Sequence, residues 1–160
     1  MVTIKELQPH HVRAAKRIIR LVWKEYFKDD PRIDVRTHFD SQQSLADLNG
    51  AASRYRSNRG IFLVVLDGKR VIGTGGFIRF SGQSCEFKHV FLLEKFRSRG
   101  IGYQLTSQLI GRARELGYKK VVLGTSKRFK EAHKLYYKLG FKDCGRLDPR
   151  NLTDYMELAL

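Results

Sequence analysis

The chain contains few cysteines. Of its 160 residues only Cys85 and Cys144 are cysteines, and they stand far apart, with no CxxC pair and no His/Cys cluster at metal-ligand spacing. A disulfide framework or a zinc site would need more thiols at closer spacing. We therefore expect two free thiols and no bound metal.

The chain also lacks a long apolar run. Hydrophobic residues make up 42% and charged residues 29% of the sequence, which is ordinary usage for a globular domain. No stretch approaches the roughly 20 apolar residues that span a bilayer. The segment from Met1 to Leu7 is interrupted by Lys5 and Glu6 and has no secretory core. These features predict a soluble cytoplasmic protein that does not bind membranes.

Acidic residues are scarce relative to basic ones. The 16 Asp and Glu stand against 31 Lys and Arg, which gives a formal net charge of +15. A field of this sign attracts polyanions. The polyanion is either nucleic acid, bound through its phosphates with salt-dependent affinity, or a small polyanionic cofactor. A solvated basic surface without a specific partner is the third interpretation, and charge alone does not separate the three.

The hydrophobic pattern predicts alternating strands and helices. Apolar residues recur at helical spacing in 10–27, 44–55, 99–116 and 129–139. Strands are expected at 2–7, 61–66, 71–80, 85–93, 121–123, 141–144 and 154–160, with a hairpin turn at Asp67-Gly68. The order is β-α-α-β-β-β-α-β-α-β-β.

This order predicts an α/β (α+β) fold with a central twisted sheet. The helix from Arg99 joins two strands as a βαβ unit, so part of the sheet is parallel there. We expect a mixed, mostly antiparallel sheet of about six to seven strands, flanked by about four helices. Since the chain shows no repeat, low-complexity tract or linker, one domain is expected over residues 1–160.

The clearest chemistry lies between the third long strand and the next helix, in Leu92-Leu93-Glu94-Lys95-Phe96-Arg97-Ser98-Arg99-Gly100-Ile101-Gly102. Two glycines at a helix start let the backbone approach an anion, which the free N–H groups and the helix dipole favour. A dinucleotide-binding turn would need glycine where Leu105 stands, and the Gly-Lys-Ser/Thr of a P-loop is absent. The segment predicts a phosphate cradle, with tight strand-to-helix packing as the alternative.

Two motifs resemble those of the GNAT N-acetyltransferases. Arg97-Ser98-Arg99-Gly100-Ile101-Gly102 is similar to the family's Arg/Gln-x-x-Gly-x-Gly/Ala. The preceding Cys85-Glu86-Phe87-Lys88-His89-Val90-Phe91-Leu92 looks like the family's Ala-Glu-Leu-Lys-Arg-Leu-Tyr-Val, and Ala132-His133-Lys134-Leu135-Tyr136-Tyr137-Lys138-Leu139-Gly140-Phe141 is similar to Ala-x-x-Leu-Tyr-x-x-x-Gly-Phe. The resemblance covers nearly the whole chain, although residues 28–60 match only in kind.

The chain departs from the family at two positions. Glu94 replaces the usual proline after the strand, and Phe129 replaces an asparagine often found three residues before the alanine of the second motif. The second departure removes one side-chain contact to the pantetheine arm of the cofactor.

The resemblance implies acetyl-coenzyme A as co-substrate. The cofactor-binding residues that it implies are Val90, Phe91, Leu92, Arg97, Ser98, Arg99, Gly100, Ile101, Gly102 and Tyr103. N–H groups from Ser98 to Gly102 would hold the pyrophosphate, while residues 90–92 would pair with the pantetheine amides as with an added strand. Lys119, Lys120, Lys127, Arg128 and Lys130 are candidates for the adenosine 3'-phosphate, or else belong to a solvated face.

The resemblance also implies catalytic residues. Tyr136 corresponds to the family's tyrosine, which would protonate the leaving thiolate as a general acid, while Tyr137 lies on another helix face. A backbone N–H near Phe91 would polarise the thioester carbonyl. The general base is Glu86 if burial raises its pKa, or His89 if a β-bulge turns His89 to the same face, or no dedicated residue.

The acceptor is the least defined part. In the family it is selected by the first two helices with their loop, here about Trp23 to Tyr55, and by the last hairpin, here about Phe141 to Leu160. Trp23, Tyr26, Phe27, Phe39 and Tyr55 either line an apolar pocket or belong to the core. Arg32, Arg36, Arg54 and Arg56 are candidates for a carboxylate clamp, and Asp29, Asp30, Asp34 and Asp40 for an acidic patch that admits a cation.

We therefore expect an N-acetyltransferase that moves the acetyl group of acetyl-coenzyme A to a primary amine of a small molecule or peptide, by direct attack in a ternary complex. A homodimer is left open. The alternative function is a non-catalytic coenzyme A- or RNA-binding module on the same fold. Such a module would not need Tyr136, and no RNP-like aromatic pair or zinc-knuckle spacing supports specific nucleic-acid binding.

Overall fold

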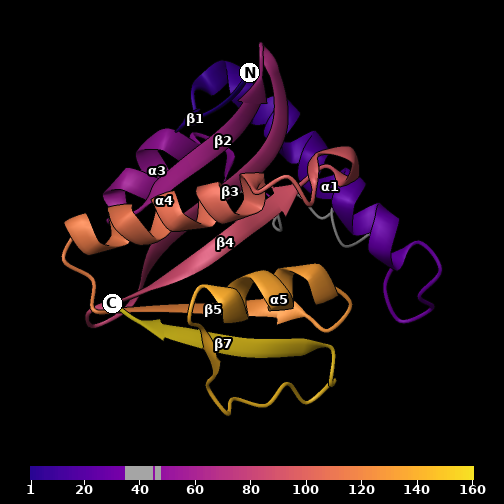
Figure 1. The fold of residues 1–160 in the computed structure, drawn as a ribbon, viewed down its shortest axis with the longest axis vertical. Coiled ribbons are helices and arrows are strands. Elements are labelled where there is room, and N and C mark those ends of the chain that lie inside the picture. The colour runs from indigo at the N-terminus through magenta and orange to yellow at the C-terminus, as the bar shows by residue number, and fades with distance from the viewer. Residues whose placement is uncertain (35–44, 46–47) are drawn as a thin grey trace.

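The computed structural model describes residues 1–34, 45 and 48–160 (Figure 1). One seven-stranded sheet contains β1 (Val2–Glu6), β2 (Ile61–Asp67), β3 (Arg70–Ser81), β4 (Ser84–Leu92), β5 (Lys120–Ser126), β6 (Lys142–Asp143) and β7 (Thr153–Ala159). The α-helices are α1 (Val12–Phe27), α3 (Ala51–Ser57), α4 (Ile101–Glu115) and α5 (Lys130–Lys138). Short 3-10 turns at Pro9–His11 and Glu94–Phe96 precede α1 and α4.

The strand order is β1-β2-β3-β4-β5-β7-β6. Every neighbouring pair is antiparallel except β4 and β5, which are parallel and connected through α4. The predicted mixed, mostly antiparallel sheet flanked by helices is therefore confirmed, as is the position of its parallel pair.

Two elements differ most from the predicted boundaries. The predicted helix over 44–55 corresponds to α3, which begins only at Ala51. Gly50 precedes it in a left-handed conformation (φ 65°) and so sets its start. Residues 44, 46 and 47 lie outside the described ranges. The predicted strand at 121–123 is longer, since β5 pairs with β7 from Lys120 opposite Ala159 to Ser126 opposite Thr153. This pairing extends polar residues of β5 into the site.

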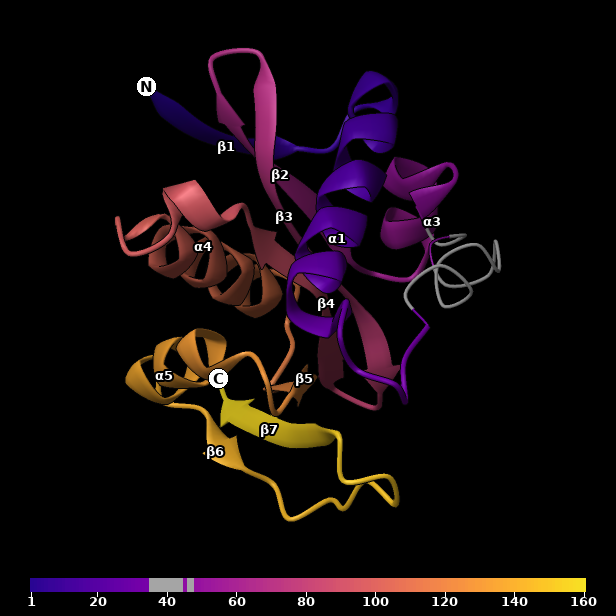
Figure 2. The same cartoon turned by 90° about the vertical axis from the view of Figure 1, so that its right-hand side faces the viewer.

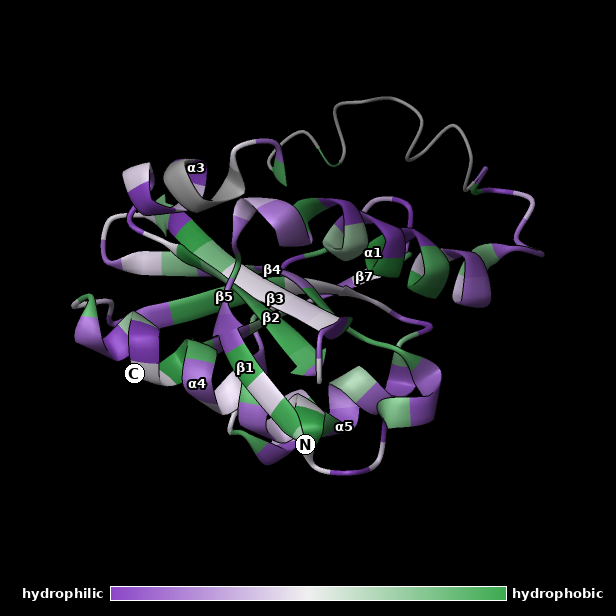
Figure 3. Cartoon of the chain, turned by 90° about the horizontal axis from the view of Figure 1, so that it is seen from above, coloured by the Kyte–Doolittle hydropathy of each residue, from purple (hydrophilic) through white to green (hydrophobic). Residues whose placement is uncertain are grey.

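Helices cover both faces of the sheet, as Figures 1 and 2 show: α4 and α5 lie on one face, α1 and α3 on the other. Because both faces are covered, strand β2 reads as a continuous apolar run, and residues Ile61 to Leu66 are all buried. Figure 3 shows these hydrophobic strands between the two helical layers. Each fully buried Leu, Ile, Val or Phe side chain contributes about 1.5–3 kcal/mol to stability.

The apolar stripe of α1 places its C-terminal half over the sheet. Ala15, Ile18, Ile19 and Val22 recur every three or four residues and belong to one buried cluster with Val64 of β2, while α1 itself lies over β3 and β4. The last turn of α1 therefore reaches the region above β4.

Strands β4 and β5 pair only over their first residues. The parallel ladder joins Ser84 to Lys120, Cys85 to Val121 and Glu86 to Val122, and no pair joins the described residues beyond these. Each strand keeps its other neighbour, β3 or β7, so the two diverge inside the sheet (Figure 1). This fork positions the candidate site.

Both cysteines are free, Cys85 buried and Cys144 exposed. In the described ranges, no helix is long and apolar enough to cross a lipid bilayer.

Candidate functional site

A cavity of about 690 Å³ occupies the fork between β4 and β5. Its walls come from β4, the loop into α4, the end of β5, α5 and the last turns of α1. The lining includes Trp23, Tyr26, Glu86, His89, Val90, Phe91, Leu92, Arg97, Ser98, Gly100, Gly102, Tyr103, Ser126, Phe129, Lys134 and Tyr136. Eight of the ten predicted cofactor-binding residues thus line one cavity, together with both predicted catalytic residues.

The predicted cradle forms the turn into α4. Ser98 (φ 59°) and Gly100 (φ 77°) adopt left-handed conformations, and Gly100 is the residue before the first helical turn. Within the described residues no side chain caps this helix start, so its first N–H groups remain available for an anion. Gly102 itself has no side chain that could cover these amides. A Cβ at this position would contact the Leu135 side chain at 3.4 Å.

Two cradle residues do not line the cavity. Ile101 is buried in the core under α4, and the Arg99 guanidinium lies over the Phe96 ring, 5.7 Å from its centre. The Ile101 side chain is therefore out of reach of a cofactor, whereas Arg99 is exposed outside the cavity lining.

The Arg97 side chain turns away from the cradle and joins the loop to α1. Its Nε donates to the carbonyl of Leu92 at 2.9 Å, and its two Nη atoms donate to the Glu25 carboxylate at 2.7 and 3.0 Å. Nη1 also donates to the Tyr26 hydroxyl at 3.1 Å. The guanidinium therefore braces the cradle against α1, and the Arg97 main chain is left for the cofactor.

A β-bulge interrupts β4 next to the fork. Thr74 pairs with Phe91 and Gly76 with Lys88, so His89 and Val90 together lie opposite Gly75. His89 adopts φ 54°, and its carbonyl accepts a hydrogen bond from Thr74 Oγ1 at 2.7 Å. The half-buried His89 ring lies 6.3 Å from the ring of Phe62, which belongs to the core cluster beneath α1. The bulge on which the His89 hypothesis depended is present.

The bulge also decides which main-chain groups of β4 face the fork. The N–H of Leu93 donates to Ile72 of β3 at 3.0 Å, and the carbonyl of Leu92 accepts from Arg97. Main-chain groups alternate along a strand, so those of Phe91 point to β3 and those of Leu92 point into the fork. Of the N–H groups near Phe91, those of Val90 and Leu92 therefore face the fork, and Phe91 lines the cavity.

Glu86 is the last β4 residue paired with β5. Its side chain is 34% exposed, and one of its oxygens lies 3.9 Å from Lys88 Nζ. The burial on which the Glu86 hypothesis rested is not found. Glu86 and His89 both line the cavity, so geometry leaves both as candidate bases.

Tyr136 of α5 is 5% exposed and packs on the Phe141 ring, 5.4 Å between centres. Burial raises the pKa of its hydroxyl well above the usual value, so the phenol is neutral at physiological pH. No fully buried side-chain oxygen of the described residues lacks a partner, and the Tyr136 hydroxyl bonds to none of them; this oxygen therefore reaches the cavity. The next residue, Tyr137, is 49% exposed and donates to Asp143 at 3.0 Å.

An aromatic cluster closes the fork on the α1 side. Phe129, the residue before α5, packs edge-on against Trp23, Tyr26, Phe27 and Phe91, at 6.1, 4.7, 5.8 and 5.9 Å between ring centres. Sequence comparison marks Phe129 only as a missing asparagine. Of the predicted pocket aromatics, Trp23 and Tyr26 line the cavity, whereas Tyr55 is buried against Phe62; Phe39 lies outside the described residues.

The basic residues predicted for the 3'-phosphate are placed elsewhere. Lys120 pairs with Glu157 at 3.4 Å, Lys127 with Asp154 at 2.9 Å and Arg128 with Asp30 at 2.6 Å. None of the five predicted cations is among the described cavity-lining residues, which include Lys134 instead. One turn further along α5, Lys138 lies over the Tyr103 ring at 5.3 Å.

A second cavity of about 300 Å³ adjoins the first. It is lined by Trp23, Phe27, Arg32, Ile33, Asp34, Ser126, Arg150, Leu152 and Thr153. Three of these, Trp23, Ser126 and Thr153, also line the main cavity.

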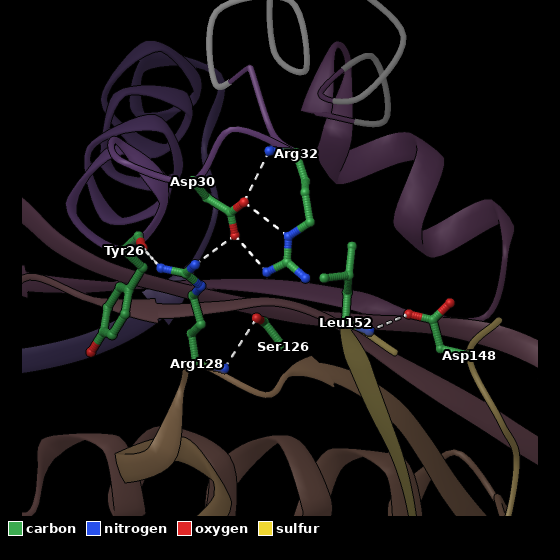
Figure 4. Close-up of polar contacts among 7 residues, drawn as sticks. All are labelled: Tyr26, Asp30, Arg32, Ser126, Arg128, Asp148 and Leu152. Atoms are coloured by element: carbon green, nitrogen blue, oxygen red, sulfur yellow. Dashed lines mark hydrogen bonds and ion pairs between the residues drawn. The ribbon is translucent and has the colours of Figure 1, made fainter. Parts of the chain in front are cut away.

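The buried carboxylate of Asp30 holds one side of the second cavity together (Figure 4). Its oxygens accept hydrogen bonds from the backbone N–H, Nε and Nη2 of Arg32, at 2.9–3.0 Å, and from Nη2 of Arg128 at 2.6 Å. Hydrogen bonds from Arg32 hold the pKa of this carboxyl far below its usual range. Asp30 is therefore not part of an open acidic patch, and Asp40 lies outside the described residues.

Fewer arginines than predicted are placed where they could bind a carboxylate. Arg56 pairs with Glu6 at 2.6 Å on the far side of the sheet edge, and Arg36 lies outside the described residues. Arg32 remains at a cavity.

Comparison with known proteins identifies relatives of the chain. Residues 15–141 match the family model described as Acetyltransferase (GNAT) family. The chain is 35% identical over 75 residues to the uncharacterised N-acetyltransferase YjgM of Escherichia coli, and 28% identical over 116 residues to human N-acetyltransferase 8. These matches cover 45% and 69% of this chain and 45% and 51% of the relatives, so the chain spans about half the length of both.

Solved structures match over nearly the full chain. A GNAT-family acetyltransferase of Staphylococcus aureus has a TM-score of 0.84 at 20% identity, covering 99% of both chains. The PaiA N-acetyltransferase of Thermoplasma acidophilum, solved in complex with coenzyme A, has a TM-score of 0.81 at 18% identity, covering 100% of this chain and 99% of that one. At these identities the likeness establishes the fold. Together with the family model, it shows that the chain belongs to the GNAT acetyltransferase family.

Proposed function

We propose that residues 1–160 form one N-acetyltransferase domain, which transfers the acetyl group of acetyl-coenzyme A to a primary amine of a small molecule or peptide by direct attack in a ternary complex. The observation that carries this proposal is the fork cavity. It joins an uncapped helix start, an open strand edge and a buried tyrosine in one space.

Different walls of the cavity match different parts of the cofactor. N–H groups at the start of α4 receive the pyrophosphate, where the helix dipole favours negative charge. The main chain of Val90 and Leu92 pairs with the pantetheine amides, because this side of β4 has no strand partner within the described residues. Lys134 and Lys138 lie along α5 beside Tyr103 and supply positive charge near the cradle.

The reaction needs a base, an oxyanion donor and an acid. The amine nitrogen attacks the thioester carbonyl carbon, and its proton passes to Glu86 or His89, directly or through water. The developing oxyanion accepts a hydrogen bond from the N–H of Val90 or Leu92. When the C–S bond breaks, the Tyr136 hydroxyl gives its proton to the thiolate. Burial raises the pKa of Tyr136, so the phenol keeps its proton until the thiolate forms beside it.

Two measurements test the proposal. Calorimetric titration with acetyl-coenzyme A at two salt concentrations, beside a nonspecific RNA, should show micromolar binding of the coenzyme that persists in salt and RNA binding that fades. Absence of coenzyme binding would overturn the proposed function and favour a nucleic-acid module.

The second measurement compares Tyr136→Phe with Tyr137→Phe. We expect the first to lower kcat by about 10²- to 10⁴-fold with little change in the Kd of acetyl-coenzyme A. The second removes a hydroxyl from a different, exposed face of α5 and should leave kcat within a factor of about two of the parent. Unchanged turnover in Tyr136→Phe would remove the general-acid assignment and leave the cofactor assignment standing.

A further inference from the structure

The second cavity opens onto the space where the acetyl group would be transferred. It shares Trp23, Ser126 and Thr153 with the main cavity. A molecule lying in the second cavity therefore has a direct path to the fork.

The walls of this cavity are apolar and its charged residues are mostly cationic. Trp23, Phe27, Ile33 and Leu152 form the apolar surface. Arg32 and Arg150 supply two guanidinium groups from opposite loops, whereas Asp34 is the one acidic side chain among the described lining residues and has an interaction of its own.

Arg32 belongs to a cluster with surplus positive charge. One carboxylate, that of Asp30, serves the guanidinium groups of both Arg32 and Arg128, so the three side chains together carry a net charge of +1. The Arg32 side chain is nevertheless 58% exposed. Its remaining Nη1 is turned toward Leu152 (Figure 4), on the cavity side.

The Arg150 side chain is more exposed than that of Arg32 and lies farther from its carboxylate partner. The carboxylate of Asp148 accepts the backbone N–H groups of Arg150, Leu152 and Thr153 at 3.0–3.1 Å. These bonds shape the loop before β7, and Figure 4 shows the one from Leu152. The Arg150 guanidinium comes no closer to Asp148 than 3.8 Å through Nε, and its side chain is 77% exposed. The loop thus holds the exposed Arg150 guanidinium at the rim of the second cavity.

We propose that the second cavity binds the acceptor, and that the acceptor is a primary amine carrying a carboxylate, which Arg32 and Arg150 receive while the amine points into the fork. This inference rests on the proposed acetyltransferase function. A planar guanidinium matches a carboxylate in two-point geometry, which Arg150 offers, while Arg32 adds a contact through Nη1 because its Nε and Nη2 donate to Asp30. The apolar wall accommodates the body of the acceptor. The net charge of +15 repels polyamines and basic peptides.

The test uses pairs of acceptors in which an amide replaces the carboxylate. Initial rates are measured for L-phenylalanine against L-phenylalaninamide and for 4-aminobutyrate against 4-aminobutanamide, with spermidine as the polycation. We expect kcat/KM to be at least about tenfold higher for the carboxylates, because a hydrogen bond to a charged group is worth about 1.5–3 kcal/mol.

Variants then assign this preference to the cavity. Arg150→Gln should raise KM for the preferred carboxylate about tenfold and leave the amide unchanged, with kcat and acetyl-coenzyme A affinity retained. Arg150→Lys should recover only part of the loss. Arg146→Gln is the matched control, since it removes the same charge from the same loop, where Arg146 lies over the Tyr155 ring at 4.2 Å.

The outcomes separate the two proposals. Equal or faster acetylation of the amides or of spermidine, a preference that survives in Arg150→Gln, or acceptance of none of the carboxylates by an enzyme that binds acetyl-coenzyme A would overturn the carboxylate inference. Failure to bind acetyl-coenzyme A would instead contradict the proposed function.

Discussion

The two ends of the candidate site use different kinds of chemical group. At the α4 end, the proposed contacts are main-chain N–H groups held by the left-handed turn at Ser98 and Gly100. At the second cavity, they are side chains of Trp23, Arg32 and Arg150, brought together from segments more than 100 residues apart. A backbone cradle needs only small residues at fixed spacing and leaves a short motif in the sequence, whereas a side-chain pocket depends on tertiary contacts. The cofactor is therefore easier to predict than the acceptor.

The largest effect on binding is expected when a side chain is placed in the backbone cradle. Gly102→Glu would direct a carboxylate at the first-turn N–H groups of α4, beside Leu135. It should weaken acetyl-coenzyme A binding by about 100-fold or more, because like charge opposes the phosphates where the helix start attracts them. Calorimetry measures the change in Kd.

Gly111→Glu is the control for Gly102→Glu. It adds the same charge to the same helix at a position where a Cβ meets nothing within 4 Å, and it should retain the parent affinity. Equal affinity in both variants would place the phosphates away from the cradle.

A smaller effect is expected where the two ends are linked. Arg97→Gln removes the hydrogen bonds from the cradle loop to Glu25 and Tyr26 of α1. Since the Arg97 side chain is largely buried, the free energy of unfolding should fall by about 2 kcal/mol. The amine KM should rise more than the acetyl-coenzyme A Kd, because α1 forms part of the acceptor wall. Denaturant unfolding and steady-state kinetics measure both.

Arg114→Gln removes the same charge from an exposed position of α4 and should change neither quantity. If Arg97→Gln weakens only cofactor binding and leaves stability intact, the guanidinium serves the phosphates and does not brace α1.

The smallest effect concerns the acceptor end alone and depends on pH. The Asp30 pKa is lowered in the folded protein, so its ion pairs stabilise the fold above the unfolded carboxyl pKa of about 4, and the stabilisation is lost as pH falls below that value. Asp30→Asn should lower Tm by a few degrees at pH 7, and the gap between the two Tm curves should begin to narrow as the pH falls below about 4.

Asp29→Asn, at the exposed neighbouring residue, should follow the parent curve throughout. Parallel curves for Asp30→Asn and the parent would show that Asp30 does not contribute through its charge.

Local patterns predicted most of the fold, including the glycine-containing turn at the start of α4. The β2–β3 hairpin follows from Asp67-Gly68, and Tyr137 faces away from Tyr136 because adjacent helical residues point to different sides. Long-range pairing was not predictable. Nothing near Arg128 in the sequence indicates that it pairs with Asp30, 98 residues away. The role of Phe129 likewise depends on rings from α1 and β4.

The fork gives this sheet an edge in its interior. Exposed strand edges at the margin of a sheet invite pairing with other chains and aggregation, and proteins protect them with charge, bulges or covering elements. Here the unpaired side of β4 lies beneath the aromatic cluster of Phe129 and the last turn of α1, and a bulge at His89 bends the strand. The open backbone of β4 inside the sheet is therefore shielded from pairing with another protein strand by the same kinds of device that protect an outer edge.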